Sequence, residues 1–211
     1  MTKQILFFAD PMCSWCWGFS PVLDAIGEHF GDRAPVSLVV GGLRPGTSEV
    51  MSDQMKASIR HHWEEVGRTT GQPFSFAFFE RDGFVYDTEP ACRAAVTVRN
   101  LKPQAALAYF RALHRGFYVD NENITKPGPL AELAGNFGIE PKAFADAFTS
   151  AEMIDQTIDD FRYARSLGIT GFPALVAKDD GGLAALALGY RPFEALKPVI
   201  ESWLDGPSIH G

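Results

Sequence analysis

The chain has 211 residues, 46% of them hydrophobic, and carries a formal net charge of −7 at pH 7. This length and composition predict one domain with an insertion, or two small domains, around a sizeable apolar core. The acidic balance argues against a nucleic acid or an anionic membrane as partner, and no apolar stretch approaches the roughly 18 residues that a membrane span needs.

The first forty residues predict a strand, a helix and a second strand. The apolar run Ile5–Ala9 is typical of a buried strand, and residues 14–30 carry apolar side chains at helical spacing. Residues 35–40 form a second strand pattern, which ends at Gly41 and Gly42. This order is that of a parallel β-α-β unit.

The start of the chain carries no secretory pattern. Residues 1–4 lead directly into the first strand, whereas a secretory leader has a longer apolar region that ends in small residues. We therefore expect a cytoplasmic protein. In that reducing compartment, cysteines are more often catalytic or metal-binding than structural.

Two cysteines stand two residues apart in Cys13-Ser14-Trp15-Cys16, between the first strand and the first helix. Backbone N–H groups at a helix N-terminus favour a thiolate, so Cys13 is the predicted nucleophile. Its attack on a disulfide would give a mixed disulfide, which Cys16, one turn further along, would resolve. The alternative is a structural or zinc-binding pair. Zinc usually requires four ligands, and no second Cys pair or spaced His pair accompanies this one, so we expect neither a metal nor a dissociable cofactor.

The middle of the chain predicts helices separated by Pro and Gly, at residues 51–66, 90–100, 103–118, 130–137 and 142–148. Adjacent His61 and His62 point about 100° apart on a helix, so we expect a solvated face rather than a shared metal. The aromatic run at 74–79 predicts core packing, with the lining of a cleft as the alternative. Cys92 is expected to be a small buried residue, with a thiol that faces the site as the alternative.

The last third of the chain returns to β structure. Residues 149–152, Thr-Ser-Ala-Glu, have the form of a capping box and predict the start of another helix. Strands at 174–178 and 183–188 flank an Asp-Asp-Gly-Gly turn, a strong hairpin signal, and a final helix is expected over 193–204. The whole order predicts an α/β fold with a four-stranded sheet that a helical insertion interrupts.

Four features together resemble the DsbA family of thioredoxin-fold disulfide oxidoreductases. The Cys pair follows the first strand, and Pro21 lies eight residues after Cys13, where members often kink the active-site helix. Gly171-Phe172-Pro173 opens the third strand like the family's cis-proline loop, and a hairpin with a final helix completes the pattern.

The resemblance implies a division of the chain and a role for Pro173. Residues 1–47 and 150–211 would form a discontinuous thioredoxin-like domain, and residues 48–149 a helical insertion domain. Pro173 would form a cis peptide bond that faces the disulfide and exposes the backbone of Phe172 to a substrate strand.

The substrate-binding residues are expected to be Asp10, Met12, Trp15 and Phe172, while Trp17 is expected mostly in the core. Many relatives carry a buried acid on the first strand, six residues before the nucleophile, where this chain has a phenylalanine. Asp10 is therefore also the candidate for proton transfer.

Within the family, the segment around the Cys pair is similar to a cytosolic bacterial branch described as predicted disulfide isomerases, near FrnE-type and glutathione transferase kappa-like proteins. This implies a thiol–disulfide oxidoreductase or isomerase that acts on protein or small-molecule disulfides. Glutathione or a thioredoxin system would recycle it. Two alternatives stay open: a glutathione-dependent isomerase or transferase of the kappa or 2-hydroxychromene-2-carboxylate isomerase type, and a binding module with a redox switch.

Overall fold

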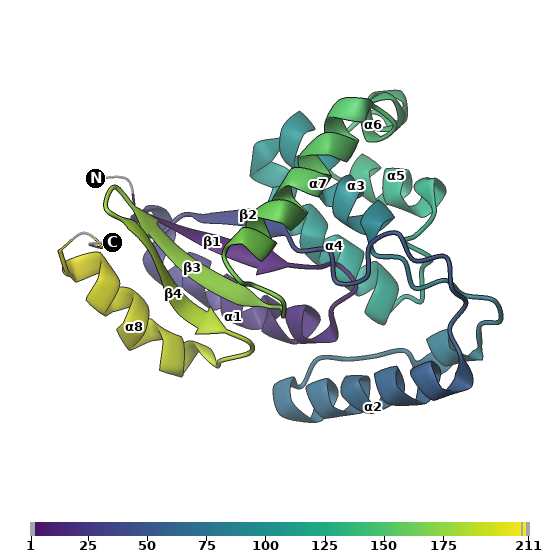
Figure 1. Cartoon of the computed structure of the whole chain (residues 1–211), viewed down its shortest axis with the longest axis horizontal. Helices are drawn as coiled ribbons and strands as arrows, with labels where there is room; N and C mark the ends of the chain where they lie inside the picture. Colours follow the sequence, from purple (N-terminus) through teal and green to yellow (C-terminus); the bar gives the residue numbers. More distant parts are fainter. Residues whose placement is uncertain (1–2, 208, 210–211) are drawn as a thin grey trace.

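The computed structural model describes residues 3–207 and 209. Its centre is a four-stranded sheet of β1 (Gln4–Ala9), β2 (Val36–Val40), β3 (Ala174–Asp179) and β4 (Gly182–Leu188), in the order β2-β1-β3-β4. β1 is parallel to β2 and antiparallel to β3, and β3 and β4 form an antiparallel hairpin (Figure 1). The predicted α/β fold with a helical insertion is confirmed.

Helices cover both faces of this sheet and fill the segment between β2 and β3. They are α1 (Ser14–Phe30), α2 (Asp53–Thr70), α3 (Glu89–Leu101), α4 (Ala106–Tyr118), α5 (Pro127–Gly135), α6 (Pro141–Phe148), α7 (Ala151–Ser166) and α8 (Phe193–Asp205). α1 and α8 lie on one face of the sheet and α7 crosses the other (Figure 1).

Successive residues of β1 alternate between two apolar layers. Phe7 joins the large core on the side of α1, where its ring lies 5.9 Å from that of Phe19. Phe8 joins a smaller layer on the side of α7, with its ring 5.6 Å from Tyr163. A strand that is buried on both faces reads as a continuous apolar run, which is why the sequence identifies it.

Pro21 lies inside α1 and has no N–H to donate to the carbonyl of Trp17. The side chain of Gln72 donates to that carbonyl instead, at 3.0 Å. In return, Trp17 Nε1 donates to the carbonyl of Pro73, also at 3.0 Å. These two hydrogen bonds hold the segment after α2 against the first turns of α1.

Trp63 on α2 is the centre of an aromatic cluster and is buried. Its ring lies within 6 Å of the rings of Phe74, Phe78, Phe79, Phe117 and Tyr118. The predicted core packing of residues 74–79 is thus confirmed, and Phe76–Glu80 forms a short 3-10 helix.

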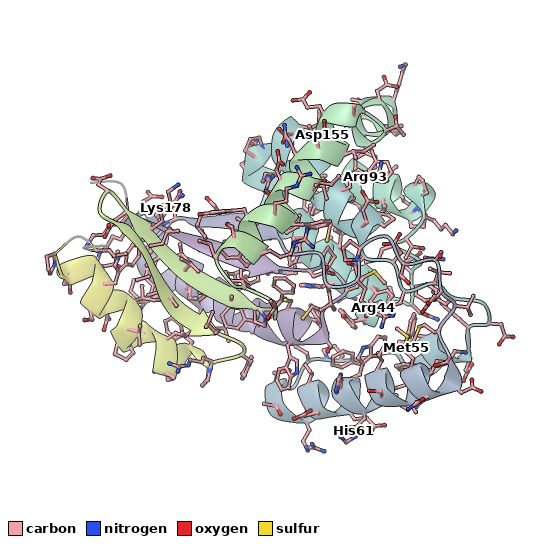
Figure 2. All side chains as sticks on the ribbon, viewed as in Figure 1. Arg44, Met55, His61, Arg93, Asp155 and Lys178 are labelled. Atoms are coloured by element: carbon pink, nitrogen blue, oxygen red, sulfur yellow. The ribbon has the colours of Figure 1, made fainter. Side chains whose placement is uncertain are left out.

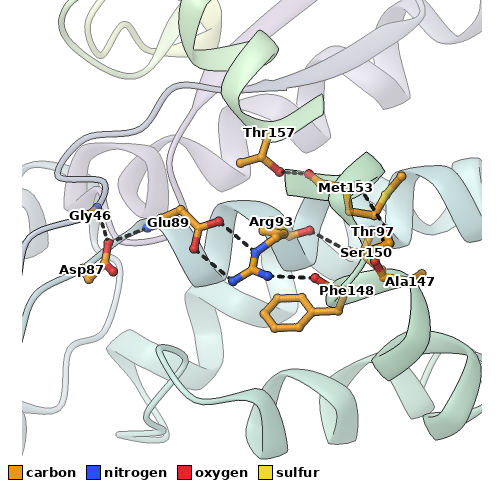
Figure 3. A network of polar contacts seen from close by, with 10 residues as sticks. All are labelled: Gly46, Asp87, Glu89, Arg93, Thr97, Ala147, Phe148, Ser150, Met153 and Thr157. Atoms are coloured by element: carbon orange, nitrogen blue, oxygen red, sulfur yellow. Dashed lines mark hydrogen bonds and ion pairs between the residues drawn. The ribbon is translucent and has the colours of Figure 1, made fainter. Parts of the chain in front are cut away.

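Arg93 joins α3 to the end of α6. It forms an ion pair with Glu89 at 2.8 Å and donates to the carbonyl of Phe148 at 2.9 Å (Figure 3). Its guanidinium also lies 4.2 Å from the centre of the Phe148 ring. Just before α3, the carboxylate of Asp87 accepts from the N–H of Gly46 at 2.8 Å. That bond holds the loop after β2 against the start of α3.

The capping box predicted at the start of α7 is wrong by one residue. Ser150 is the N-cap, and its Oγ accepts from the N–H of Met153 at 3.2 Å. Thr149 instead donates to the carbonyl of Ala145 at 2.8 Å. The residue three positions after the true cap is therefore a methionine rather than Glu152.

Helix limits in the insertion also differ from the prediction. α2 begins later than predicted because Ser52 Oγ accepts from the N–H of Met55, and it ends at Thr70, where Gly71 caps it in the left-handed conformation. α5 begins three residues early, at Pro127, since proline suits the first helical turn. The division into two domains stays a prediction, and its outermost limits at residues 1–2, 208 and 210–211 lie outside the described residues.

Candidate functional site

Cys13 is the N-cap of α1, at the end of the loop that follows β1. Its carbonyl accepts the N–H groups of Cys16 and Trp17 at 3.0 and 3.1 Å, and its own N–H donates to the carbonyl of Asp10 at 3.1 Å. The thiol donates to the carbonyl of Phe172 at 3.4 Å. The nucleophile predicted from the sequence therefore lies at the helix N-terminus, beside the loop before β3.

Cys16 lies one turn further into α1 and has no exposed surface, whereas Cys13 keeps 6%. Both are free thiols. Burial raises the pKa of Cys16, and the neighbouring Cys13 raises it further. The two thiols thus differ in access, and the deeper one is held in its protonated form.

The loop before β3 completes the surroundings of Cys13. The Phe172–Pro173 peptide bond is cis, as the resemblance implies. The ring of Phe172 lies over Gly41, where a Cβ atom would fall 2.0 Å from the ring. The N–H of Gly189 donates to the carbonyl of Pro173 at 2.8 Å. Only a residue without a side chain at position 41 leaves room for this placement of Phe172.

A cavity of about 350 Å³ lies beside Cys13. Its lining residues are Met12, Cys13, Ser14, Trp15, Leu43, Arg44, Ile59, His62, Trp63, Tyr86, Gly171 and Phe172. We call residues 12–15 and 171–172 the dithiol wall, and the lining residues between 43 and 86 the insertion wall. The reactive sulfur therefore faces a space that two distant parts of the chain enclose.

Met12 and Trp15 both line the cavity, in the dithiol wall, and their binding of substrate stays a prediction. Trp15 is half-buried, with its ring 5.7 Å from that of Tyr190. Met12 is almost fully buried, and its carbonyl accepts from the hydroxyl of Tyr86 at 2.6 Å. Trp17 is buried, as expected, and turned away from the cavity.

Asp10 does not line the cavity, so its predicted contact with substrate is corrected to a position beneath the site. It has no exposed surface. One carboxylate oxygen accepts from the N–H of Met12 at 2.8 Å, and the other accepts from the N–H of Leu43 at 2.7 Å and from the thiol of Cys92 at 3.4 Å. Asp10 therefore links the loop before Cys13 to the loop after β2.

Burial dominates the electrostatics of Asp10 and its neighbours. Burial raises the pKa of Asp10, while the N–H groups of Leu43 and Met12 oppose that rise. Burial also raises the pKa of Cys92, and the charge of Asp10 adds to it. Cys92 is thus a buried thiol, as expected, but one with a carboxylate as its partner.

His114 on α4 lies on the other side of the same loop. Its Nε2–H donates to the carbonyl of Asp10 at 3.3 Å, and its ring packs 4.5 Å from that of Phe110. Burial lowers the pKa of His114 from 6.5 to about 3. The imidazole is therefore neutral at physiological pH and acts as a hydrogen-bond donor.

The insertion wall carries the positive charge of the cavity. Arg44 lies between the end of the sheet and α2 (Figure 2), and its backbone exchanges two hydrogen bonds with Thr88. His62 was expected on a solvated face; it is exposed but also lines the cavity, whereas His61 points outward. None of the twelve lining residues has a carboxylate, so the cavity suits an anionic group.

Sequence reasoning missed most of the insertion wall. Leu43, Arg44, Ile59 and Tyr86 come from a loop, a helix and a short bridged segment in which Val50 pairs with Val85. No motif marks them. The loop after β2 brings Leu43 and Arg44 to the site through its bonds to Asp10 and Thr88, while the packing of α2 brings Ile59.

Within the described ranges, no group of three or more His, Cys, Asp or Glu side chains is arranged to hold a metal ion. In the same part of the chain, no helix has both the length and the hydropathy that a bilayer span requires. Cys13 and Cys16 are free thiols one helical turn apart at the start of α1, an arrangement that can perform thiol–disulfide exchange.

The family model of the DSBA-like thioredoxin domain matches residues 4–201. A protein of Nitrosomonas europaea, provisionally described as a protein disulfide isomerase, superposes with a TM-score of 0.92 at 39% identity, over 97% of this chain and 98% of that one. The cytosolic disulfide reductase DsbM of Pseudomonas aeruginosa gives a TM-score of 0.78 at 27% identity, over 95% and 98% of the two chains. DsbM has also been solved with GSH.

Among curated proteins, the chain is similar to the ClpXP adapter protein SpxH of Halalkalibacterium halodurans. The two are 22% identical over an alignment of 210 positions that covers 95% of this chain and 67% of that protein. The SpxH of Bacillus subtilis is 20% identical, and the match covers 57% of its length. The chain thus spans roughly two thirds or less of these relatives.

Proposed function

The chain belongs to the family of DSBA-like thioredoxin domains, and from that premise we propose that it uses the Cys13–Cys16 dithiol to reduce or isomerise disulfides of proteins or small molecules. One observation carries the proposal: the Cys13 thiol, at the N-terminus of α1, lies 3.4 Å from the Phe172 carbonyl and opens onto the cavity. Catalysis requires the Cys13 sulfur to lie close both to the N–H groups of the helix N-terminus and to a backbone segment on which a substrate can dock. The contact between Cys13 and Phe172 supports this arrangement.

The reaction is a pair of thiol–disulfide exchanges. The Cys13 thiolate attacks one sulfur of the substrate disulfide, which forms a mixed disulfide and releases the other sulfur as a thiol. The Cys16 thiolate then attacks the Cys13 sulfur, closes the Cys13–Cys16 disulfide and releases the second thiol. Two electrons pass from the dithiol to the substrate. Isomerisation follows when a substrate thiol, rather than Cys16, attacks the mixed disulfide.

The burial of Cys16 keeps this thiol protonated until the mixed disulfide has formed. Because the pKa of Cys16 is raised by burial and by Cys13, Cys16 holds its proton while Cys13 reacts. Its proton must leave when the mixed disulfide forms, and we assign Asp10 as the acceptor. The pKa of this carboxyl is raised by burial, and its charge is among the causes that raise the pKa of Cys16. A raised carboxyl pKa suits proton transfer near neutral pH.

Glutathione is the proposed reductant of the Cys13–Cys16 disulfide, in a cytoplasmic setting. The DsbM relative has been solved with GSH. Glutathione carries two carboxylates, and Arg44 and His62 line a cavity whose other lining residues bear no acid. Two glutathione molecules would restore the dithiol and leave as glutathione disulfide. A thioredoxin system is the alternative reductant.

Turnover of insulin disulfides by Cys13→Ser and Cys16→Ser variants tests the proposal, with glutathione as reductant. Cys13→Ser is expected to lose turnover completely, because the remaining thiol of the pair, Cys16, has no exposed surface from which to attack a substrate. Cys16→Ser is expected to accumulate a mixed disulfide that mass spectrometry detects. Turnover by Cys13→Ser at the wild-type rate would contradict the proposal.

The direction of electron flow follows from the reduction potential of the pair, read by Trp15 and Trp17 fluorescence during equilibration with glutathione. A value near the thioredoxin figure of about −270 mV supports a reductase or isomerase. A value near the DsbA figure of about −120 mV supports an oxidant.

A glutathione-dependent isomerase or transferase is the second candidate, favoured by the same cationic cavity. The two candidate functions differ in whether the reaction requires Cys16: disulfide reduction does, and glutathione-dependent isomerisation or transfer does not. If Cys13→Ser binds glutathione tightly and saturably while the pair shows no two-electron couple, the second candidate replaces the first.

A further inference from the structure

The peptide unit that joins Met12 to Cys13, directly before the nucleophile, is hydrogen-bonded at both ends. Its carbonyl oxygen accepts from the hydroxyl of Tyr86 at 2.6 Å, and its N–H donates to the carbonyl of Asp10 at 3.1 Å. The second bond closes a local turn, whereas the first spans 74 residues of the chain. Because a peptide unit is planar and turns as one piece, these two bonds together fix the backbone that leads into Cys13.

The hydroxyl of Tyr86 is held in place by its surroundings. The Tyr86 ring is buried and lies 5.7 Å from the ring of Phe117 and 6.2 Å from that of Phe78. Two residues further along, the N–H of Thr88 donates to the carbonyl of Arg44 at 3.3 Å. The donor is therefore already in position and does not have to be ordered when it bonds to the Met12 carbonyl.

The same hydroxyl keeps its proton. Burial raises the pKa of Tyr86; the neighbouring hydroxyl of Tyr118 opposes this rise, and the charges of Asp10 and Cys13 add to it. Tyr86 thus stays a neutral O–H donor throughout the pH range in which thiols ionise. Since a charge on Cys13 acts on the phenolic oxygen of Tyr86, the O–H dipole of Tyr86 must act in turn on the Cys13 sulfur.

We propose that Tyr86 is a positioning residue for the nucleophile: its hydroxyl fixes the peptide unit between Met12 and Cys13 and compensates the negative end of the Met12 carbonyl beside the reacting sulfur. The inference rests on the proposed function, in which Cys13 attacks a disulfide. It adds that a side chain of the insertion wall sets the reactivity of the dithiol wall. Tyr86 acts through the backbone and does not need to touch the substrate.

Loss of the hydroxyl has two consequences for Cys13, and both disfavour its thiolate. The Met12 carbonyl becomes a buried acceptor without a donor, which is costly, so the peptide unit turns and weakens the bond from the Cys13 N–H to Asp10. The partial negative charge of that carbonyl also acts on the sulfur without compensation. Ionisation of Cys13 is therefore expected to require a higher pH.

Tyr86→Phe tests this, because it removes the hydroxyl and keeps the ring. Iodoacetamide alkylates the reduced protein at a series of pH values, and mass spectrometry assigns the modification to Cys13. We expect the midpoint of the pH–rate profile to rise by about one unit, so that alkylation slows about tenfold below the midpoint. At high pH the rate should return to that of the wild type, since the thiolate is then fully formed. A general structural defect would not recover with pH.

Tyr109→Phe is the matched control. Tyr109 on α4 is also buried, and its hydroxyl donates to the carbonyl of Leu130 at 2.9 Å, outside the cavity. Both substitutions remove a hydrogen bond from a tyrosine hydroxyl to a backbone carbonyl, so their effects on unfolding free energy should be similar. Only Tyr86→Phe is expected to displace the pH–rate profile of Cys13.

The other titratable groups around the sulfur are shared by the wild type and Tyr86→Phe. They lie on α1, the loop after β1, the loop after β2, α2 and α4, and they are Cys16, Asp10, Arg44, His62, His114 and Tyr118. Cys16 is the thiol coupled most directly to Cys13. The displacement should therefore persist when Tyr86→Phe is compared with its parent in a Cys16→Ser background.

A second measurement does not depend on rates. Hydrogen exchange of the Cys13 amide reports its bond to the Asp10 carbonyl. Faster exchange in Tyr86→Phe, with no change in Tyr109→Phe, is the expected result.

Replacement of Tyr86 by 3-fluorotyrosine keeps the hydroxyl and makes it more acidic, and hence a stronger donor. It is expected to move the midpoint in the opposite direction, to lower pH. If Tyr86→Phe does not fold, this replacement decides the question.

Three outcomes overturn the inference: an unchanged midpoint in folded Tyr86→Phe, an equal displacement by Tyr109→Phe, or a 3-fluorotyrosine protein that titrates like the wild type. Alkylation by iodoacetamide involves no disulfide. Failure of the wild type to reduce insulin disulfides therefore counts against the proposed function alone, and the two failures are distinguishable.

Discussion

The two walls of the cavity beside Cys13 are built by different means. The dithiol wall comes from two short segments, residues 12–15 and 171–172, and contains both the reactive sulfur and the carbonyl that contacts it. The insertion wall comes from positions spread between 43 and 86, on a loop, α2 and a bridged segment. The comparison indicates that the dithiol wall depends on two short motifs that the pairing of β1 with β3 brings together, whereas the insertion wall depends on the tertiary packing of several separate segments.

The largest effect is expected from Trp63→Ala, which removes the centre of the insertion wall. Deletion of a buried tryptophan ring costs about 3–5 kcal/mol of unfolding free energy. Reaction with a small disulfide should persist at temperatures where the variant stays folded, because the dithiol wall does not contain Trp63. Urea unfolding and single-turnover kinetics measure the two quantities.

Trp63→Phe is the control for that change. The indole N–H of Trp63 has no hydrogen-bond partner in the described part of the chain, so a phenyl ring removes volume but no hydrogen bond. If Trp63→Ala abolishes the reaction while the protein is still folded, the two walls are not separable.

The second effect concerns pH and His114, which supports the loop of the dithiol wall. Because burial lowers the pKa of His114 to about 3, the folded protein resists its protonation. Its contribution to stability is complete above the unfolded pKa of 6.5 and is lost as the pH falls from 6.5 towards 3. Between these two pH values the folded and unfolded states differ by nearly one bound proton, which gives a slope of about 1.4 kcal/mol per pH unit.

His114→Gln takes up no proton, so the difference in unfolding free energy between wild type and variant should shrink as the pH falls from 7 to 4. Denaturant titrations at each pH measure it. Because the raised pKa of Asp10 acts in both proteins, it largely cancels in the difference. A difference that stays constant with pH would show that His114 titrates normally.

The third effect tests the packing of the Phe172 ring against Gly41, which positions Phe172 in the dithiol wall. Gly41→Ala would place a Cβ atom 2.0 Å from the tip of that ring. The ring can turn away, so the expected cost is about 1 kcal/mol, at the low end for overpacking. Thiol reactivity of Cys13 should change with it, because the carbonyl of the same residue contacts the sulfur.

Gly27→Ala is the matched control, since no other group lies within 4 Å of a Cβ atom there. It lies within α1 and should be neutral or stabilising, because alanine favours a helix. Equal effects of the two substitutions on the reactivity of Cys13 would contradict the role given to Gly41.

The smallest effect is expected from Arg44→Gln in the insertion wall. It should raise the KM for glutathione-bearing disulfides about fivefold, roughly 1 kcal/mol, and leave kcat unchanged. The loss should shrink at high salt, which screens exposed charges. Arg33→Gln, which removes a charge at an exposed ion pair with Asp205 outside the cavity, is the control.

The difference between the walls also explains which residues of the site the sequence could predict and which it could not. Cys13, Cys16 and Pro173 lie in short motifs whose spacing fixes their geometry, so their placement is predictable. Arg44 and Tyr86 reach the cavity through tertiary hydrogen bonds, of the Arg44 backbone to Thr88 and of the Tyr86 hydroxyl to Met12. A single sequence carries no periodic signal for such contacts.

Asp10 shows the limit of prediction within a motif. Its spacing from Cys13 placed it near the site, but spacing could not tell whether the carboxylate points to solvent or into the core. The N–H groups of Met12 and Leu43, and the Cys92 thiol, turn it inward. Leu43 and Cys92 come from distant segments, which no local pattern identifies.

The proline within α1 has a consequence for how the two walls move. Since Pro21 leaves the Trp17 carbonyl open to Gln72, and Trp17 itself donates to Pro73, the helix that carries the dithiol is joined to the end of α2 in both directions. Local opening of either segment must break both bonds. We therefore expect the start of α1 and the segment after α2 to open together, so that the insertion wall stays against the dithiol wall while these two bonds are intact.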